Sequence, residues 1–298
     1  MNRKKALVTK TPKDYKLLWM AMPFIVIVFL FSYVPIFGWI YSFFDYVPGV
    51  SIFNCDFVGL DYFKLIFRDD NILRSLKNTF IFAIINICLT PLPMFMAILL
   101  NELRNGPIKK FTQTFTTLPN FIWVIIFSLA TALFASDGIV TGLATAMGLG
   151  DASNSLLGSN EAVYWFQSFL LQWKTLGWNS IIYMAAISGI DQEQYEAARV
   201  DGAGYFQCAL HVTLPAMMET FVVLFILNIG NFLNTGYEQY LLFKNSLTAT
   251  NIEVLDLYTY NMDYSYGVAI SVVKSLVSIT LVVVANLVAK KIRGRAVI

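Results

Sequence analysis

The sequence has few charged residues for its length. Only 13% of its 298 residues are Asp, Glu, Lys or Arg, whereas 57% are hydrophobic and the mean hydropathy is +0.62. An ordinary soluble domain carries about a quarter charged residues, so this composition excludes one. The net charge of +2 is not gathered on a soluble face, and we expect no nucleic acid as a partner.

Residues that form metal sites and hydrolytic sites are also scarce. One histidine, His211, and three widely separated cysteines offer no metal-ligand spacing and no disulfide framework. The sequence contains no phosphate-binding G-x-x-x-x-G-K-[ST] loop, so the chain should not hydrolyse ATP. We therefore expect a protein that is not an enzyme and that binds no metal or cofactor itself.

The chain consists largely of apolar runs that are long enough to cross a bilayer. The first, at 17–44, is too long for the apolar core of a signal peptide and lacks a small-residue cleavage site, which predicts a retained helix with kinks at Pro23 and Pro35. Further runs lie near 79–100, 112–135, 163–188, 217–235 and 267–289. We expect an all-α membrane protein with six transmembrane helices. The short apolar piece 139–147 suits a re-entrant or interfacial helix.

The basic residues predict how these helices are oriented. Most of the 21 Lys and Arg residues fall in segments on the same side as the N-terminus, and such segments face the cytoplasm. The expected organisation is therefore a cytoplasmic segment 1–16, a membrane domain 17–290 and a cytoplasmic tail 291–298. Both termini would be cytoplasmic.

One polar stretch, 189–215, interrupts the apolar runs. Asp191 and Gln194 suit a capping box at the start of a short helix, Gly202 suits its end, and Pro215 would open the next run. Four carboxylates oppose a single arginine here, whereas a helix lying on anionic lipid carries Lys and Arg. Docking into a basic protein groove is therefore favoured over a lipid-lying helix or a plain connecting loop.

The spacing within this stretch resembles the EAA loop of the membrane subunits of binding-protein-dependent ABC importers, written E-A-A, three residues, G, nine residues, I-x-L-P. The matching residues are Glu196, Ala197, Ala198, Gly202, Leu214 and Pro215, with Val212 in place of the isoleucine. Residues around them resemble the sugar-importer branch of the maltose-type superfamily, namely Asp201, Ala203, Gln207, His211 and Thr213.

This resemblance implies a type I ABC importer permease fold in a bacterial cytoplasmic membrane. The loop would be a coupling helix in a cleft of an ATPase, where its glutamate pairs with a basic residue. The implied partners are a second homologous permease, two cytoplasmic ATPase subunits that hold ATP and Mg, and an extracytoplasmic solute-binding lipoprotein. The predicted coupling residues are Glu196, Ala197, Ala198, Asp201, Gly202, Leu214 and Pro215.

Polar residues inside the runs indicate a candidate substrate path. Asn228, Asn231 and Asn234 are three residues apart, which would place them on one broad helix face. Hydrogen bonding between helices is the simpler interpretation of Asn228 and Asn179, and for Lys274 a snorkelling side chain and a functional one are equally open. A sugar needs hydrogen-bond partners and an aromatic face. The predicted path residues are Trp173, Lys174, Asn231, Asn234, Tyr237 and Glu238.

The stretch from Asn231 to Asn286 resembles the lipoprotein-B-type branch of these sugar permeases, whose members are associated with import of oligosaccharides released from polysaccharides. It includes NFLNTGYEQ and SYGVAISVVKSLVSITLVVVAN. Together with the six-helix layout, the resemblance covers nearly the whole chain and implies oligosaccharide import by alternating access. An ABC permease for a non-sugar solute is the nearer alternative. A secondary sugar transporter is less favoured because no internal repeat is evident.

Overall fold

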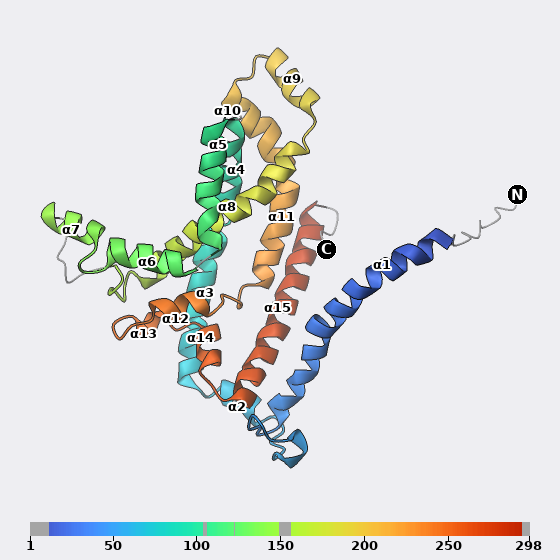
Figure 1. The fold of residues 1–298 in the computed structure, drawn as a ribbon, viewed down its shortest axis with the longest axis vertical. Coiled ribbons are helices and arrows are strands. Elements are labelled where there is room, and N and C mark those ends of the chain that lie inside the picture. Colours follow the sequence, from blue (N-terminus) through green and yellow to red (C-terminus); the bar gives the residue numbers. More distant parts are fainter. Residues whose placement is uncertain (1–11, 104–105, 122, 149–155, 294–298) are drawn as a thin grey trace, which may run out of the picture. The chain divides into compact units, whose positions relative to one another are not determined.

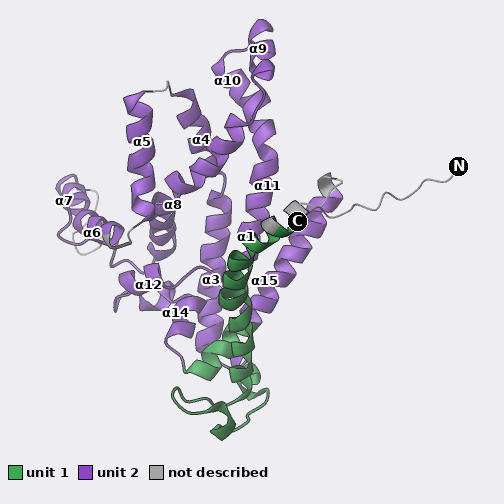
Figure 2. Cartoon of the chain, turned by 45° about the vertical axis from the view of Figure 1, so that its right-hand side comes forward, with its two compact units in different colours: residues 1–65, 263–272 green, residues 66–262, 273–298 purple. Residues whose placement is uncertain are grey.

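The structure is a computed structural model that describes residues 12–103, 106–121, 123–148 and 156–293. The described residues are helical apart from turns, loops and an isolated antiparallel bridge between Phe44 and Phe57. They form two compact units, Met1–Leu65 with Asp263–Val272 and Ile66–Met262 with Val273–Ile298 (Figure 2). Most of the predicted terminal segments 1–16 and 291–298 lies outside the described residues.

Five helical stretches in the described chain are long and apolar enough to cross a membrane. They are Leu17–Phe43, Asp70–Glu102, Ile125–Ala146, Tyr205–Gly230 and Tyr264–Lys291. The predicted run 163–188 forms one helix of 26 residues, α8 (Val163–Ser188), which has the length of a span but a more polar composition. The prediction of an all-α, multi-pass membrane protein is confirmed, whereas the count of six stays a prediction.

The first unit contains the first predicted membrane helix. α1 (Pro12–Val28) continues as a π-helical turn, Phe29–Tyr33, and a 3₁₀ helix, Val34–Phe43. Pro35 therefore lies in the first turn of the 3₁₀ helix, where its missing N–H leaves no hydrogen bond unmade. The loop that follows includes a 3₁₀ turn, Ile52–Asn54, and α2 (Asp61–Ile66). The N–H of Tyr46 in this loop donates to Ser265 Oγ at 2.9 Å, near the start of α15 (Tyr264–Arg293).

The second unit holds the remaining helices (Figure 1). They are α3 (Asp70–Leu89), α4 (Leu92–Glu102), α5 (Pro107–Thr117), α6 (Trp123–Phe134), α7 (Ile139–Ala146), α8, α9 (Gln192–Val200), α10 (Tyr205–Cys208), α11 (Leu214–Gly230), α12 (Glu238–Phe243), α13 (Ala249–Ile252), α14 (Leu255–Tyr260) and the rest of α15.

Among the described residues, helix α8 belongs to two clusters of buried apolar side chains in this unit. Phe166 and Leu170 on its first half pack with α3, α6, α12 and the α13–α14 segment. Tyr183 and Ile187 on its second half pack with α4 and with Met217 of α11. A helix that packs on several sides can carry polar residues on the face left for a cavity, which accounts for its mixed composition.

Polar side chains hold α14 against α3. Asn78 donates to the carbonyls of Thr250 and Glu253 at 2.9 and 3.0 Å, and Tyr258 donates to Asp69 at 2.5 Å. Burial and the hydrogen bond to Asp69 raise the pKa of Tyr258, so the phenol keeps its proton and remains a donor. These bonds fix the short helices that follow α11 onto the membrane helices.

The prediction of one continuous membrane helix at 112–135 is wrong. α5 ends at Thr117, a 3₁₀ turn Leu118–Asn120 follows, and α6 runs in another direction (Figure 1). Pro119 accounts for the break, because it lacks an N–H and disfavours helix at the preceding residue. The piece 139–147, expected as a separate re-entrant or interfacial helix, forms α7. Together with most of α6 it makes up the third apolar stretch, Ile125–Ala146.

Candidate functional site

The predicted coupling segment is a helix with a well-defined start and end. Asp191 caps α9, because its side chain accepts a hydrogen bond from the N–H of Glu193 at 3.1 Å. Gly202 follows the helix with φ +83°, and its N–H donates to the carbonyl of Arg199, while Ala203 donates to Ala198 at 2.9 Å. These two bonds define a Schellman motif. Glycine suits this position because an L side chain is strained there.

The second half of the segment departs from the prediction at Pro215. α10, a π-helical turn Ala209–Thr213 and α11 form one helical stretch, so Pro215 lies in the first turn of α11 without restarting the chain. The wider π turn, which precedes it, lets the helix continue where a regular α turn would clash with the proline ring. The Tyr195 hydroxyl lies 2.9 Å from Thr213 Oγ1 and ties α9 to this stretch.

The tip of the segment combines exposed acidic and exposed apolar side chains. Of the predicted coupling residues, Ala198 and Leu214 are half-buried, and the exposed ones are Glu196, Ala197, Asp201, Gly202 and Pro215. Beside them, Val200, Tyr205 and Phe206 are 87%, 75% and 74% exposed. In Figure 1, α9 and α10 lie beyond the ends of α4, α5 and α8. A surface that combines exposed apolar side chains with acidic ones suits a protein partner.

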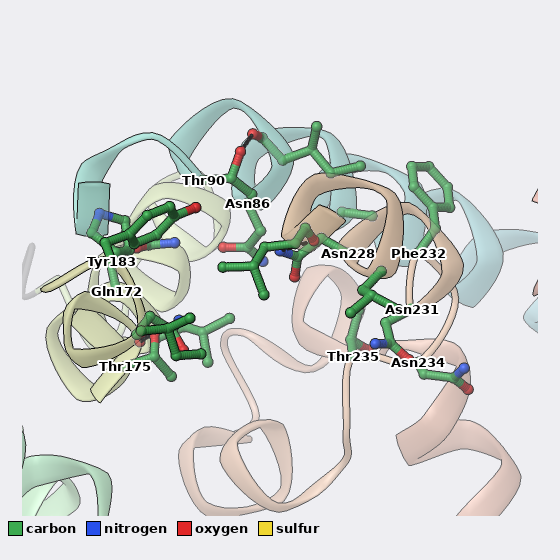
Figure 3. Close-up of a pocket in the computed structure, with 18 residues that line it drawn as sticks. Asn86, Thr90, Gln172, Thr175, Tyr183, Asn228, Asn231, Phe232, Asn234 and Thr235 are labelled. Atoms are coloured by element: carbon green, nitrogen blue, oxygen red, sulfur yellow. Dashed lines mark hydrogen bonds between the residues drawn. The ribbon is translucent and has the colours of Figure 1, made fainter. Parts of the chain in front are cut away.

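A cavity of about 390 Å³ lies between α3, α4, α8, α11 and the turn after α11. Most of its polar lining consists of carboxamides and hydroxyls: Asn86, Thr90, Gln172, Thr175, Asn179, Tyr183, Asn228, Asn231, Asn234 and Thr235. Figure 3 shows the α8 residues at one end, Asn231, Asn234 and Thr235 at the other, and Asn86 and Asn228 between them. A cavity of this size and polarity can take a small polar ligand.

The structure brings Asn228, Asn231 and Asn234 to this cavity, although they do not share a helix face. α11 ends at Gly230, Asn231 is its C-terminal cap, and Asn234 lies in the turn that follows. The expected helical run to 235 is therefore wrong. Nor does Asn228 bridge two helices through its amide nitrogen, which donates to the carbonyl of Leu224 in the same helix at 3.0 Å.

The other predicted path residues lie off this cavity. Trp173 stacks on Phe169 and packs against the larger apolar cluster. Tyr237 packs against the same cluster and stacks on Tyr260, with ring centroids 4.5 Å apart. Lys174 and Glu238 interact electrostatically with each other. The aromatic side chains that do line the cavity are Tyr183 and Phe232.

Sequence reasoning missed a buried ion pair next to the cavity. Lys274 of α15 is only 7% exposed and pairs with Asp256 of α14, so the side chain does not snorkel. The second oxygen of Asp256 accepts a hydrogen bond from the N–H of Gly236 at 2.9 Å. Gly236 follows the lining residue Thr235 directly. The pair therefore holds the cavity turn in place.

A known protein family matches most of this chain. The sequence profile described as "Binding-protein-dependent transport system inner membrane component" matches residues 89–294. The chain belongs to this family. The match covers α4 to α15, and so includes the coupling segment and three of the four helices that line the cavity.

Individual proteins are similar over nearly the whole chain. Protein LplB of Bacillus subtilis (strain 168) is 38% identical over 94% of this chain and 90% of its own. The "Polygalacturonan/rhamnogalacturonan transport system permease protein YteP" of the same organism is also 38% identical, over 97% and 92%. A bacterial ABC transporter described as importing the acidic polysaccharide alginate matches with a TM-score of 0.81 and 28% identity, over 94% of this chain and 96% of that one.

Proposed function

We propose that this chain is the permease subunit of an ATP-driven importer that takes up an oligosaccharide by alternating access. The observation that carries the proposal is α9, a capped, acidic and exposed helix in a member of the binding-protein-dependent permease family. The cavity lined by amides and hydroxyls supports a sugar as the substrate, since each sugar hydroxyl can both donate and accept. The transport systems named for YteP and for alginate support the same class.

Helix α9 would couple transport to ATP hydrolysis. We propose that Glu196 pairs with a basic residue in a cleft of a cytoplasmic ATPase, while Ala197, Ala198 and Gly202 allow close approach. Leu214 and Pro215 would hold the base of the segment, and Asp201 would add to its acidic surface. Closure of the ATPases around ATP and Mg would then move α9, and through the Tyr195–Thr213 contact move α10 and α11 with it.

The proposed complex contains a second, homologous permease, two ATPase subunits and an extracytoplasmic binding protein. A bacterial alginate transporter has been solved in complex with a pentasaccharide-bound periplasmic protein, and it matches this chain with a TM-score of 0.81 and 28% identity. We place both termini and α9 in the cytoplasm. The turn after α11 and helices α12 to α14 would then face the binding protein, at the outer end of the passage.

Reversing the charge of Glu196 tests the coupling role. In proteoliposomes containing the whole complex, we expect Glu196→Lys to lower ATP-dependent sugar uptake by at least roughly tenfold, because breaking an interfacial charge pair costs about 2–5 kcal/mol. Glu193→Lys is the matched control, since Glu193 is an exposed glutamate of the same helix outside the motif. Equal uptake by the two variants would contradict the proposed role of Glu196.

A further inference from the structure

The cavity contains no charged side chain among the residues that line it. Of its 18 lining residues, six are carboxamides, three are threonines and one is a tyrosine, and the others are apolar. The six carboxamides come from three different helices and from the turn after α11. Carboxamides and hydroxyls hydrogen-bond well to neutral hydroxyl groups. They provide no counter-charge for a carboxylate, whose burial without a cation is unfavourable.

The polarity of Asn86 also fits an uncharged ligand. Its side-chain carbonyl oxygen is buried and has no hydrogen-bond partner among the described residues. Figure 3 shows Asn86 near the middle of the cavity, close to Asn228. A buried acceptor of this kind needs a donor. A sugar hydroxyl can supply that donor, whereas a carboxylate placed at this position could not.

Two lysines lie near the cavity, but neither adds a charge to its lining. Lys174 lies between the lining residues Gln172 and Thr175, but it is not part of the lining and interacts electrostatically with Glu238. Lys274, below the turn, is paired with Asp256. Lys274 thus has Asp256 as its counter-charge, and Lys174 lies outside the lining.

We propose that this chain's cavity selects uncharged oligosaccharides and discriminates against glycans that carry uronate carboxylates. The inference rests on the proposed transport function and narrows its substrate class. It separates this chain from transporters of acidic glycans such as polygalacturonan and alginate, which the overall similarity alone would suggest. The selection would act at the permease, in addition to any selection by the binding protein.

The first test is the composition of the glycans that the intact complex imports. Proteoliposomes with the complete complex and its binding protein receive a mixed pool of oligosaccharides, containing neutral chains, uronate chains of matched length and methyl esters of the same uronates. We expect the neutral and esterified chains to enter with ATP at least roughly tenfold faster than the acids, because an unpaired buried charge is strongly disfavoured. Import of the free acids at an equal or higher rate would overturn the inference.

The second test assigns the selection to the cavity. Asn228→Arg adds a cation to the lining and should raise the ratio of uronate to neutral uptake several-fold. Asn261→Arg is the matched control, because Asn261 donates to the carbonyl four residues earlier at 3.0 Å, as Asn228 does, but does not line the cavity. An unchanged ratio in Asn228→Arg would place the selection in the binding protein and overturn the inference. If no glycan of any kind entered with ATP, the transport function itself would be contradicted instead.

Discussion

Replacing Lys274 with methionine is expected to destabilise the folded protein by about 3–5 kcal/mol, since it would leave a buried carboxylate without its cation. The lysine and Asp256 side chains are only 9% and 16% exposed, so water cannot solvate the remaining charge well. Asp256 also holds the N–H of Gly236 at the edge of the cavity. The turn that carries Asn231 and Asn234 should therefore loosen along with the ion pair.

The measurement is thermal unfolding of the purified variants in the same detergent, arranged as a double-mutant cycle. Lys274→Met combined with Asp256→Asn removes both charges and keeps an acceptor for Gly236, so the double variant should recover most of the lost stability. Additive effects of the two single substitutions would show that the residues are not coupled and would contradict the pairing.

Gly177→Ala is expected to prevent α8 and α5 from packing closely. The yield of folded protein should therefore fall. A Cβ at Gly177 would lie closer than 3.0 Å to the backbone carbonyl of Thr116, and a backbone atom cannot rotate away. Overpacking of this kind typically costs about 1–3 kcal/mol and occasionally more. Because α8 joins both apolar clusters, a shift of this helix would disturb the whole second unit.

Gly142→Ala is the matched control, because a Cβ at Gly142 in α7 meets nothing within 4 Å. In a helix interior this change should be neutral or stabilising by about 0.5–1 kcal/mol. Size-exclusion chromatography of fluorescently tagged variants measures how much monodisperse protein each yields. A Gly177→Ala variant as abundant and as stable as Gly142→Ala would show that α5 and α8 do not approach as closely as described.

The sequence predicts the coupling segment well because its signals are local. An Asp cap and a glycine at the end of the helix act within a few residues, and the structure has the cap at Asp191 and the Schellman turn at Gly202. The turn at Leu118–Asn120 was also predictable in principle, since Pro119 marks it. The apolar run 112–135 was nevertheless predicted as one helix, because hydropathy is averaged over a window and does not register the local geometry at this turn.

The cavity is less predictable because distant segments form it. Asn86 has no local feature that distinguishes it from a helix-packing asparagine, and it became a candidate only when α3 was placed beside α11. Asn231 and Asn234 line the cavity, but not through the shared helix face that the sequence predicted, since the helix ends at Gly230 and a turn carries them there. Trp173 was predicted to line the path but does not line the cavity, because its position in α8 directs it to the apolar cluster.

As one subunit of an ATP-driven importer, this chain should be bound to its partner subunits in the native membrane. The most direct measurement is mild-detergent purification from the native membrane, followed by mass spectrometry of the proteins that remain bound. We expect to recover an ATPase with a phosphate-binding loop and a second permease of the same family. Purification of the chain alone, with ATP-independent sugar transport in vesicles, would rule out the importer function and favour a secondary transporter.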